Sequence, residues 1–273
     1  MLGRIKKHVG VLTNSNKRIV KWSSGKYTSN NIGDVLNEYL FEKIFKKEVV
    51  SYREVLNVGV PPVYSFIGSV LDNSAVKNLT VMGSGFKRET SKMVVKPKKV
   101  ISCRGPLTRG KLIKMGLEVP EVYGDPAILL PQFYKPTVEK KYRMGLIPHY
   151  VDKDLEIVEK WSSKSDVKNI DVFSPMETFV ADLKSCDFTV SSSLHGVILS
   201  HAYGIPSAWA PLSGKLAGGG FKFNDYYQSV KAETKKIQLQ DFNSPSEVEK
   251  HTSLPQLSEI SEKLLNTLKA VKV

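Results

Sequence analysis

Short apolar segments alternate with amphipathic segments along most of this 273-residue sequence, and this alternation constrains the fold more than any other feature. The short apolar runs have the length of buried strands. Segments such as 33–46 carry apolar residues at helical spacing, as helices do when they cover one face of a sheet. Strands that are connected through helices are parallel. We expect strands at 18–22, 63–67, 79–82, 100–103, 144–147, 170–173, 188–190 and 206–209, and helices at 33–46, 106–115, 155–162, 176–184, 195–203 and 257–270.

A polar segment at 133–141 interrupts this pattern and contains proline and several lysines, which is typical of a linker. The alternation restarts after it. We therefore predict an α/β protein with two Rossmann-like domains that face each other across a cleft. The predicted domains are residues 1–133 and residues 134–273, the second ending in a terminal helix. A single continuous sheet is the alternative.

The composition excludes several classes of protein. Apolar residues make up 41% of the chain, the level of a folded globular protein, and no apolar run is long enough to cross a bilayer. The first ten residues lack the apolar core of a signal peptide, and the two cysteines, Cys103 and Cys186, give neither a disulfide framework nor a zinc motif. We therefore expect a cytoplasmic protein without a metal site.

The formal net charge of +13 favours anionic partners. The lysines are scattered and no nucleic-acid-binding motif accompanies them, so we expect no nucleic-acid partner. The remaining candidates for anionic partners are phosphorylated small molecules and the inner surface of the membrane, with which the protein would associate loosely.

Four polar segments follow predicted strands, where α/β sheets place their ligands. Each also touches the start of a helix, whose free N–H groups favour anions. No Walker lysine, dinucleotide fingerprint or nucleophile elbow is present, so an ATPase, a classical NAD site and a serine hydrolase are not supported. The segments are NNIGD (30–34), GSG (83–85), SCRGPLTR (102–109) and SSSLHG (191–196).

Several residues in or near these segments are candidates for chemistry. Arg104 follows an apolar strand, where its guanidinium suits a carboxylate or phosphate, or else pairs with an acidic neighbour. Asp34 is either a general base or a partner of the helix dipole, and Asp125 in YGDP more readily fits a turn. His149 and His195 both stand at strand ends, and the helix start at His195 suits a proton acceptor.

The order of the motifs resembles the polysaccharide pyruvyl transferase family. The resemblance runs from about residue 30 to residue 206 and is carried by N-x-G-D, G-S-G, S-x-R-G-P-x-T, G-D-P-A-x-L-L-P, I-P-H-Y and S-x-S-L-H-G-x-I-L-x-H-A-Y-G-I-P. It implies a fold of the glycosyltransferase-B kind. It also implies transfer of pyruvate from phosphoenolpyruvate onto a hexose of a surface polysaccharide, or of its lipid-linked precursor, to form a cyclic ketal.

The resemblance also implies roles for individual residues. Arg104 is then an anion clamp and His195 an acid, base or phosphate contact, with phosphoenolpyruvate as the donor substrate and no other cofactor. Relatives often carry arginine where this chain has Ser193, so either Lys222 or Arg109 supplies the missing charge or the anion is held differently in this chain. We predict His195, Arg104 and Asp34 as the catalytic groups. The residues predicted to bind substrate are Asn31, Gly33, Ser84, Arg109, His149, Ser192, Ser193 and Lys222.

Two other functions compete with this one. A nucleotide-sugar glycosyltransferase fits the same architecture, and a non-catalytic sugar-binding or capsule-assembly protein fits it without any chemistry. Loss of Arg104 and His195 would abolish catalysis but would leave such a binding protein active.

Overall fold

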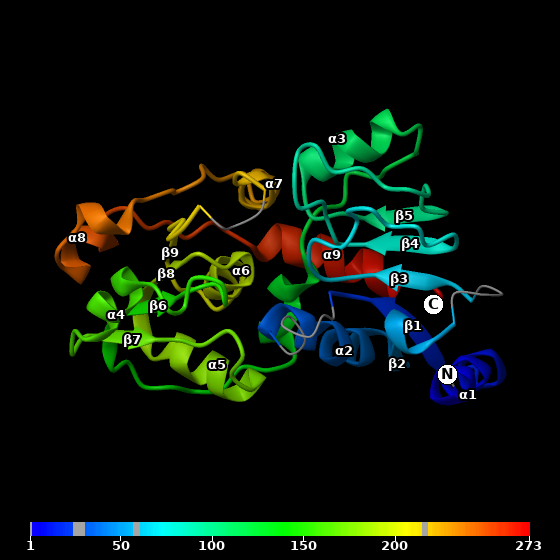
Figure 1. The fold of residues 1–273 in the computed structure, drawn as a ribbon, viewed down its shortest axis with the longest axis horizontal. Coiled ribbons are helices and arrows are strands. Elements are labelled where there is room, and N and C mark those ends of the chain that lie inside the picture. The colour runs from blue at the N-terminus through cyan, green and yellow to red at the C-terminus, as the bar shows by residue number, and fades with distance from the viewer. Residues whose placement is uncertain (1, 24–30, 57–60, 215–217) are drawn as a thin grey trace.

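The computed structural model describes residues 2–23, 31–56, 61–214 and 218–273. It contains two separate parallel sheets, with strand orders β2-β1-β3-β4-β5 and β7-β6-β8-β9. The prediction of an α/β protein with two halves is confirmed, and the alternative of one continuous sheet is wrong. Figure 1 shows the sheets at opposite ends of the molecule, with α6 and α7 of the second half turned toward the first.

The first half carries the five-stranded sheet. Its elements are α1 (Leu2–Thr13), β1 (Lys17–Lys21), α2 (Ile32–Phe45), β2 (Glu48–Ser51), the 3₁₀ turn η1 (Tyr52–Glu54), β3 (Val63–Ser65), β4 (Leu79–Met82), β5 (Lys99–Ser102), α3 (Pro106–Lys114) and η2 (Pro126–Gln132).

The second half carries the four-stranded sheet and the C-terminal segment. Its elements are β6 (Tyr142–Ile147), α4 (Glu156–Ser162), β7 (Val167–Asn169), α5 (Met176–Lys184), β8 (Cys186–Ser191), α6 (Leu194–Ala202), β9 (Ser207–Trp209), α7 (Phe221–Ser229), η3 (Leu239–Asp241), α8 (Pro245–Glu249) and α9 (Ser258–Lys269).

Most expected strands and helices are present within one or two residues, but the strand expected at 170–173 is wrong. The edge of the second sheet, beside β6, is formed by β7 instead, and the chain turns shortly after it. Asp171 causes the turn, because its carboxylate accepts a hydrogen bond from Phe173 N at 2.9 Å. Ile170 and Val172 of that segment are buried and Phe173 is half-buried, although none of them lies in a strand.

One hydrophobic cluster is shared by the two halves, and each half has a further cluster of its own. The largest cluster of buried side chains includes Val20 of the first sheet and Ile147 of the second. Helix α9 belongs to the C-terminal segment but packs against η2, β5 and α2 of the first half. The predicted division at residue 133 is not tested by these contacts and stays a prediction. They do place the last helix against the first half.

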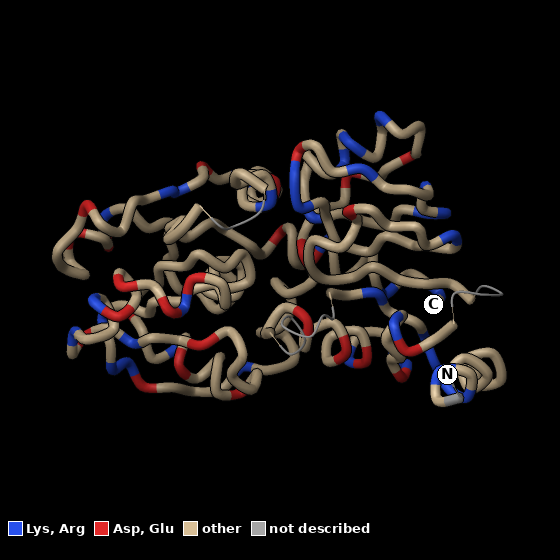
Figure 2. The backbone as a smooth tube through the Cα atoms, viewed as in Figure 1, with Lys and Arg blue, Asp and Glu red and all other residues tan. Residues whose placement is uncertain are grey.

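The positive charge is spread over both halves, as Figure 2 shows for the lysines and arginines. Among the helices that the structure describes, none combines the length and the apolar character needed to span a bilayer.

Candidate active site

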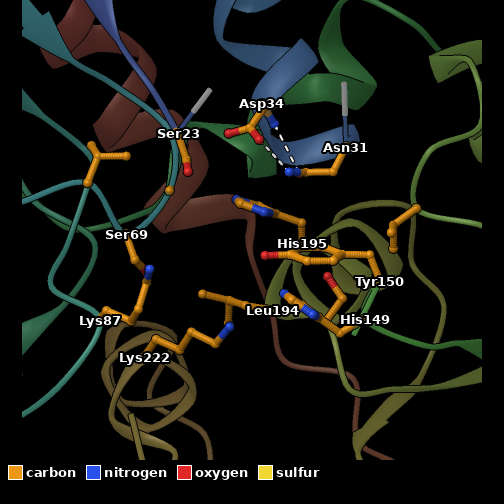
Figure 3. A pocket seen from close by; sticks show the side chains of 14 residues that line it. Ser23, Asn31, Asp34, Ser69, Lys87, His149, Tyr150, Leu194, His195 and Lys222 are labelled. Atoms are coloured by element: carbon orange, nitrogen blue, oxygen red, sulfur yellow. Dashed lines mark hydrogen bonds between the residues drawn. The ribbon is translucent and has the colours of Figure 1, made fainter. Parts of the chain in front are cut away.

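A cavity lies where the carboxyl ends of the two sheets face each other. Segments that follow β1, β3 and β4 contribute one side, and segments that follow β6, β7 and β8 contribute the other. Helices α2, α6 and α7 complete the wall. The lining residues are Ser23, Asn31, Asp34, Gly68, Ser69, Val70, Lys87, His149, Tyr150, Val172, Ser193, Leu194, His195 and Lys222 (Figure 3).

The start of α2 places a carboxyl group in this cavity. Asn31 is the N-cap, and its side chain accepts a hydrogen bond from Asp34 N and donates one to the Asp34 carboxylate. Burial raises the pKa of Asp34 to about 7, against the opposing effect of the Asn31 hydrogen bond. A carboxyl group that titrates near neutral pH is suited to accept a proton during catalysis. Asn30, the first letter of the same motif, lies outside the described residues.

His195 lies near the start of α6, between α2 and the loop before η2. A Cβ atom on Gly33 would come within 2.0 Å of His195 Nδ1, so the imidazole rests directly against the glycine backbone. On another side, His195 Nε2 lies 3.6 Å from Asp125 Oδ2. Glycine at position 33 is therefore what leaves room for the ring.

Two lysines supply positive charge on the other side of the cavity. Figure 3 shows Lys87 and Lys222 across from Asp34 and Asn31, with His195 between the two groups. Burial of the Lys222 ammonium, together with the positive charges of Arg104 and Lys87, lowers the pKa of Lys222 to about 7. An anion bound beside Lys222 would favour the charged form of this side chain.

His149 stays neutral in this setting. Burial lowers its pKa to about 3, and the nearby Lys222 and Lys87 act in the same direction. Its ring lies against Tyr150, with the ring centroids 4.2 Å apart. His149 can therefore donate or accept a hydrogen bond in the cavity but is not an acid at neutral pH.

The three serines of SSSLHG have different roles. Ser191 Oγ accepts a hydrogen bond from Ser193 N and bonds to the Ile147 carbonyl. Ser192 Oγ accepts from His149 N at 2.8 Å and donates to the buried Asp152 at 2.6 Å. Ser191 and Ser192 thus hold the loops together, whereas Ser193 faces the cavity.

Arg104 is fully buried and does not line the cavity. Its Nε donates to Asp225 Oδ2 at 3.0 Å, one terminal nitrogen donates to Ser69 Oγ at 2.6 Å, and the other to the Phe86 carbonyl. Asp225 stands on α7, one turn after Lys222. The acidic partner considered for Arg104 from the sequence is therefore present, and the ion pair joins the two halves.

Of the residues predicted to bind substrate, Gly33, Ser84, Arg109 and Ser192 also lie outside the cavity lining. Ser84 is buried and hydrogen bonds to Ser65 Oγ at 2.9 Å. Arg109 donates to the Val119 carbonyl and pairs with Glu121 at 3.1 Å. Of the two residues expected to supply the missing charge, only Lys222 lines the cavity.

The glycines of GSG have a packing role. A Cβ atom on Gly83 would lie 2.4 Å from the Pro126 ring, and one on Gly85 would lie 2.6 Å from the Arg104 guanidinium. The motif therefore lets Arg104 and η2 approach the sheet.

Sequence reasoning missed several groups at the site, among them Ser69, Lys87 and Tyr150. Ser69 and Lys87 each follow a predicted strand by a few residues, and Tyr150 directly follows His149. Their positions shortly after predicted strands are thus the sequence signal that could have identified these residues. Within the described ranges, no cluster of three or more His, Cys, Asp or Glu side chains is placed to hold a metal ion.

The two parallel sheets and the cavity between their carboxyl ends define a two-part α/β protein whose candidate active site belongs to both halves. The sequence model of the polysaccharide pyruvyl transferase family matches residues 31–211. The chain therefore belongs to this family, and the resemblance seen in the motifs is confirmed.

Two relatives illustrate the relationship. Uncharacterized protein L143 of Acanthamoeba polyphaga mimivirus is 34% identical over 205 residues, which cover 72% of this chain and 69% of the relative. Succinoglycan biosynthesis protein ExoV of Rhizobium meliloti is 29% identical over 211 residues, which cover 73% of this chain and 61% of the relative. The chain thus spans less than two thirds of the ExoV length.

Proposed function

We propose that the cavity binds phosphoenolpyruvate and that the protein transfers its pyruvyl group to a hexose of a surface polysaccharide, or of a lipid-linked precursor, as a cyclic ketal. The observation that carries the proposal is the arrangement in Figure 3: two lysines lie on one side of His195 and the carboxyl group of Asp34 on the other. Family membership supports a saccharide acceptor and pyruvyl transfer. The B-type glycosyltransferase fold is part of the same proposal, supported by the two facing sheets.

The donor is a dianionic phosphate ester with a carboxylate on the same carbon. Lys87, Lys222 and the first N–H groups of α6 hold these anions, with Ser193 at the helix start and Ser69 beside the lysines. Binding two negative charges next to Lys222 favours its ammonium form and offsets the cost of burying it.

Protonation of the donor opens the reaction. Protonated His195 gives a proton to the methylene carbon of phosphoenolpyruvate, which becomes a methyl group, and the neighbouring carbon becomes electrophilic. One hydroxyl of the hexose attacks that carbon, and Asp34 takes the hydroxyl proton. A new carbon–oxygen bond has formed while the phosphate is still attached.

Closure of the ring releases phosphate. A second hydroxyl of the same sugar attacks the same carbon, the carbon–oxygen bond to phosphate breaks, and the second hydroxyl proton returns to His195. The proton held by Asp34 leaves with the phosphate. The products are one cyclic ketal and one inorganic phosphate for each donor and acceptor consumed.

The other predicted site residues enter this proposal as supports. Asn31 and Gly33 fix Asp34 and His195, while Ser192 fixes the loop of His149, which faces the acceptor. Arg104 holds α7, and with it Lys222, through Asp225. Direct contact of Arg104, Arg109 or Ser84 with the donor stays a prediction from the sequence.

Release of inorganic phosphate from phosphoenolpyruvate in the presence of a panel of synthetic and lipid-linked saccharides tests the proposal. We expect release that depends on the acceptor, and a loss of about 10²-fold or more in turnover for His195→Gln, the usual scale for a positioned acid or base. Consumption of a nucleotide sugar in place of phosphoenolpyruvate would identify a glycosyltransferase. Saccharide binding that His195→Gln leaves intact, with no turnover of either donor, would identify a binding protein.

A further inference from the structure

Asp125 is a buried carboxylate whose two oxygens have different contacts. It is the N-cap of η2, where Oδ1 accepts a hydrogen bond from Ala127 N at 3.1 Å. Its other oxygen, Oδ2, accepts from Gly68 N at 3.1 Å and also faces His195. The side chain is fully buried. A capping role needs only Oδ1, and Oδ2 has a second lone pair, beyond the one that accepts from Gly68 N, with which it can accept from the histidine.

His195 Nε2 needs such a partner. It is a buried nitrogen without a hydrogen-bond partner within the described part of the chain, and Asp125 Oδ2 lies 3.6 Å from it. Buried polar atoms are nearly always paired, because an unpaired one loses its hydration without compensation. Catalytic hydrogen bonds that are slightly long in a ligand-free site shorten when the substrate binds.

The ring is held on its other edge as well. Gly33 lies against this edge. A Cβ atom on Gly33 would be 2.0 Å from His195 Nδ1 and 2.3 Å from Cε1. The imidazole therefore sits between the backbone of α2 and the carboxylate before η2. In such a slot the group that meets one ring nitrogen decides which nitrogen carries the proton in the neutral ring.

We propose that Asp125 is a positioning residue for His195: its carboxylate takes the Nε2–H and leaves Nδ1 as the nitrogen that exchanges a proton with the substrate. The inference rests on the proposed function for the identity of the substrate, but the pairing itself does not. Asp125 does not touch the substrate and acts through the orientation and tautomer of His195.

The tautomer can be read without any activity assay. In wild-type protein labelled with ¹⁵N, the two ring nitrogens of His195 give distinct signals, which His195→Gln identifies by their loss. We expect neutral His195 to carry its proton on Nε2. A proton on Nδ1 in the wild-type protein would overturn the proposal, and this measurement requires no variant of Asp125 to fold.

Kinetics provide the second measurement. Asp125→Asn keeps an oxygen to cap Ala127 but turns an amide N–H₂ toward Nε2 and Gly68 N, which favours the opposite tautomer and removes the Gly68 hydrogen bond. We expect kcat to fall by about 10²- to 10⁴-fold, the range seen when the orienting carboxylate of a catalytic histidine becomes an amide. We expect KM for phosphoenolpyruvate to change by less than about threefold, because uniform binding is untouched.

The combination of the two variants separates positioning from folding. If Asp125 acts through His195, adding Asp125→Asn to His195→Gln should cost little further turnover, because the two residues work as a unit. Additive losses would show that Asp125 only supports the fold. A proton on Nε2 that moves to Nδ1 in Asp125→Asn, without any pyruvyl transfer by the wild-type protein, would keep the pairing and remove the proposed function.

Discussion

Arg104 and Asp225 form a fully buried ion pair, 3.0 Å apart, that joins the first half of the molecule to helix α7 of the second. Thr108 adds two hydrogen bonds to the same carboxylate, from its backbone N–H at 2.9 Å and from its hydroxyl at 2.6 Å. Because Lys222 precedes Asp225 by one helical turn, the pair fixes the position of a lysine that faces the cavity. The position of Lys222 in the cavity thus depends on an ion pair that lies outside the cavity lining.

Removal of Arg104 should destabilise the protein strongly. Arg104→Met leaves Asp225 buried with no opposite charge, and breaking a buried pair in this way costs about 3–5 kcal/mol. Denaturant unfolding measures this loss. Arg109→Met is the matched control, because Arg109 pairs with the exposed Glu121 and such surface pairs contribute only about 0–1 kcal/mol. Equal losses for the two variants would contradict a structural role for the Arg104 pair.

Arg104→Lys tests direct contact with the donor. Lysine keeps the charge but cannot reproduce three hydrogen bonds to Asp225, Ser69 and Phe86. If Arg104 acts through α7, kcat/KM for phosphoenolpyruvate and the free energy of unfolding should fall together. A large loss in kcat/KM at unchanged stability would support the role predicted from the sequence, in which Arg104 binds the anionic donor directly.

Much of the fold was accessible from the sequence because strand and helix periodicity are local properties. The NNIGD, SSSLHG and LIPHY segments were correctly expected at strand ends and helix starts, and Asp34, Ser193 and His195 do meet in one cavity with His149 and Lys222. Helix α7 was missed, although Phe223, Tyr226 and Tyr227 are buried at helical spacing, because polar residues, including the buried Asp225, interrupt its aromatic residues.

The residue pairs that position the site, Arg104 with Asp225 and Asp125 with His195, could not be predicted from the sequence. Arg104 and Asp225 are 121 residues apart in the sequence, and only the packing of α7 against α3 brings them together. Asp125 has the local pattern of a turn and does form one, so its second contact, with His195, left no trace in the sequence. Strand-end position identifies candidates, whereas tertiary packing separates those that line a cavity from those that support it.

The predicted loose association with membranes should depend on salt. A net charge of +13 favours anionic lipid surfaces, and this attraction is screened within about 10 Å at 0.1 M salt. We expect cosedimentation with vesicles of phosphatidylserine at low ionic strength and release at about 0.5 M salt, with no binding to neutral vesicles. Binding that survives high salt would point instead to apolar insertion. Helix α1 provides the surface for that outcome, with Ile5, Val9 and Leu12 between 41% and 58% exposed.

Gly33→Ala should separate activity from stability. The new methyl group would lie 2.0 Å from His195 Nδ1 and must displace the imidazole, so turnover should fall by about 10²-fold or more. Gly110→Ala in α3 is the matched control, because its methyl group meets nothing within 4 Å. The control should retain full turnover and gain up to about 1 kcal/mol of stability, the usual difference between glycine and alanine in a helix. Normal turnover in Gly33→Ala would place His195 outside the reaction.

Donor binding should weaken as the pH rises above about 7. In the empty site the pKa of Lys222 is lowered to about 7, so above that pH its neutral amine must gain a proton before it can pair with an anion. The phosphate ester itself is fully ionised there, since its second pKa is about 6. We expect Kd for phosphoenolpyruvate, measured by calorimetry from pH 7.5 to 9, to rise by up to about tenfold per unit.

Three variants assign this pH dependence. Lys222→Arg carries a permanent charge and should bind the donor with little change across the range, whereas Lys222→Met should bind weakly at every pH. Asp34 also ionises near pH 7, and its negative charge opposes an anion with the same sign of effect. In Asp34→Asn the slope due to Lys222 should persist. A slope that survives in Lys222→Arg but disappears in Asp34→Asn would transfer the effect from the lysine to the carboxyl group.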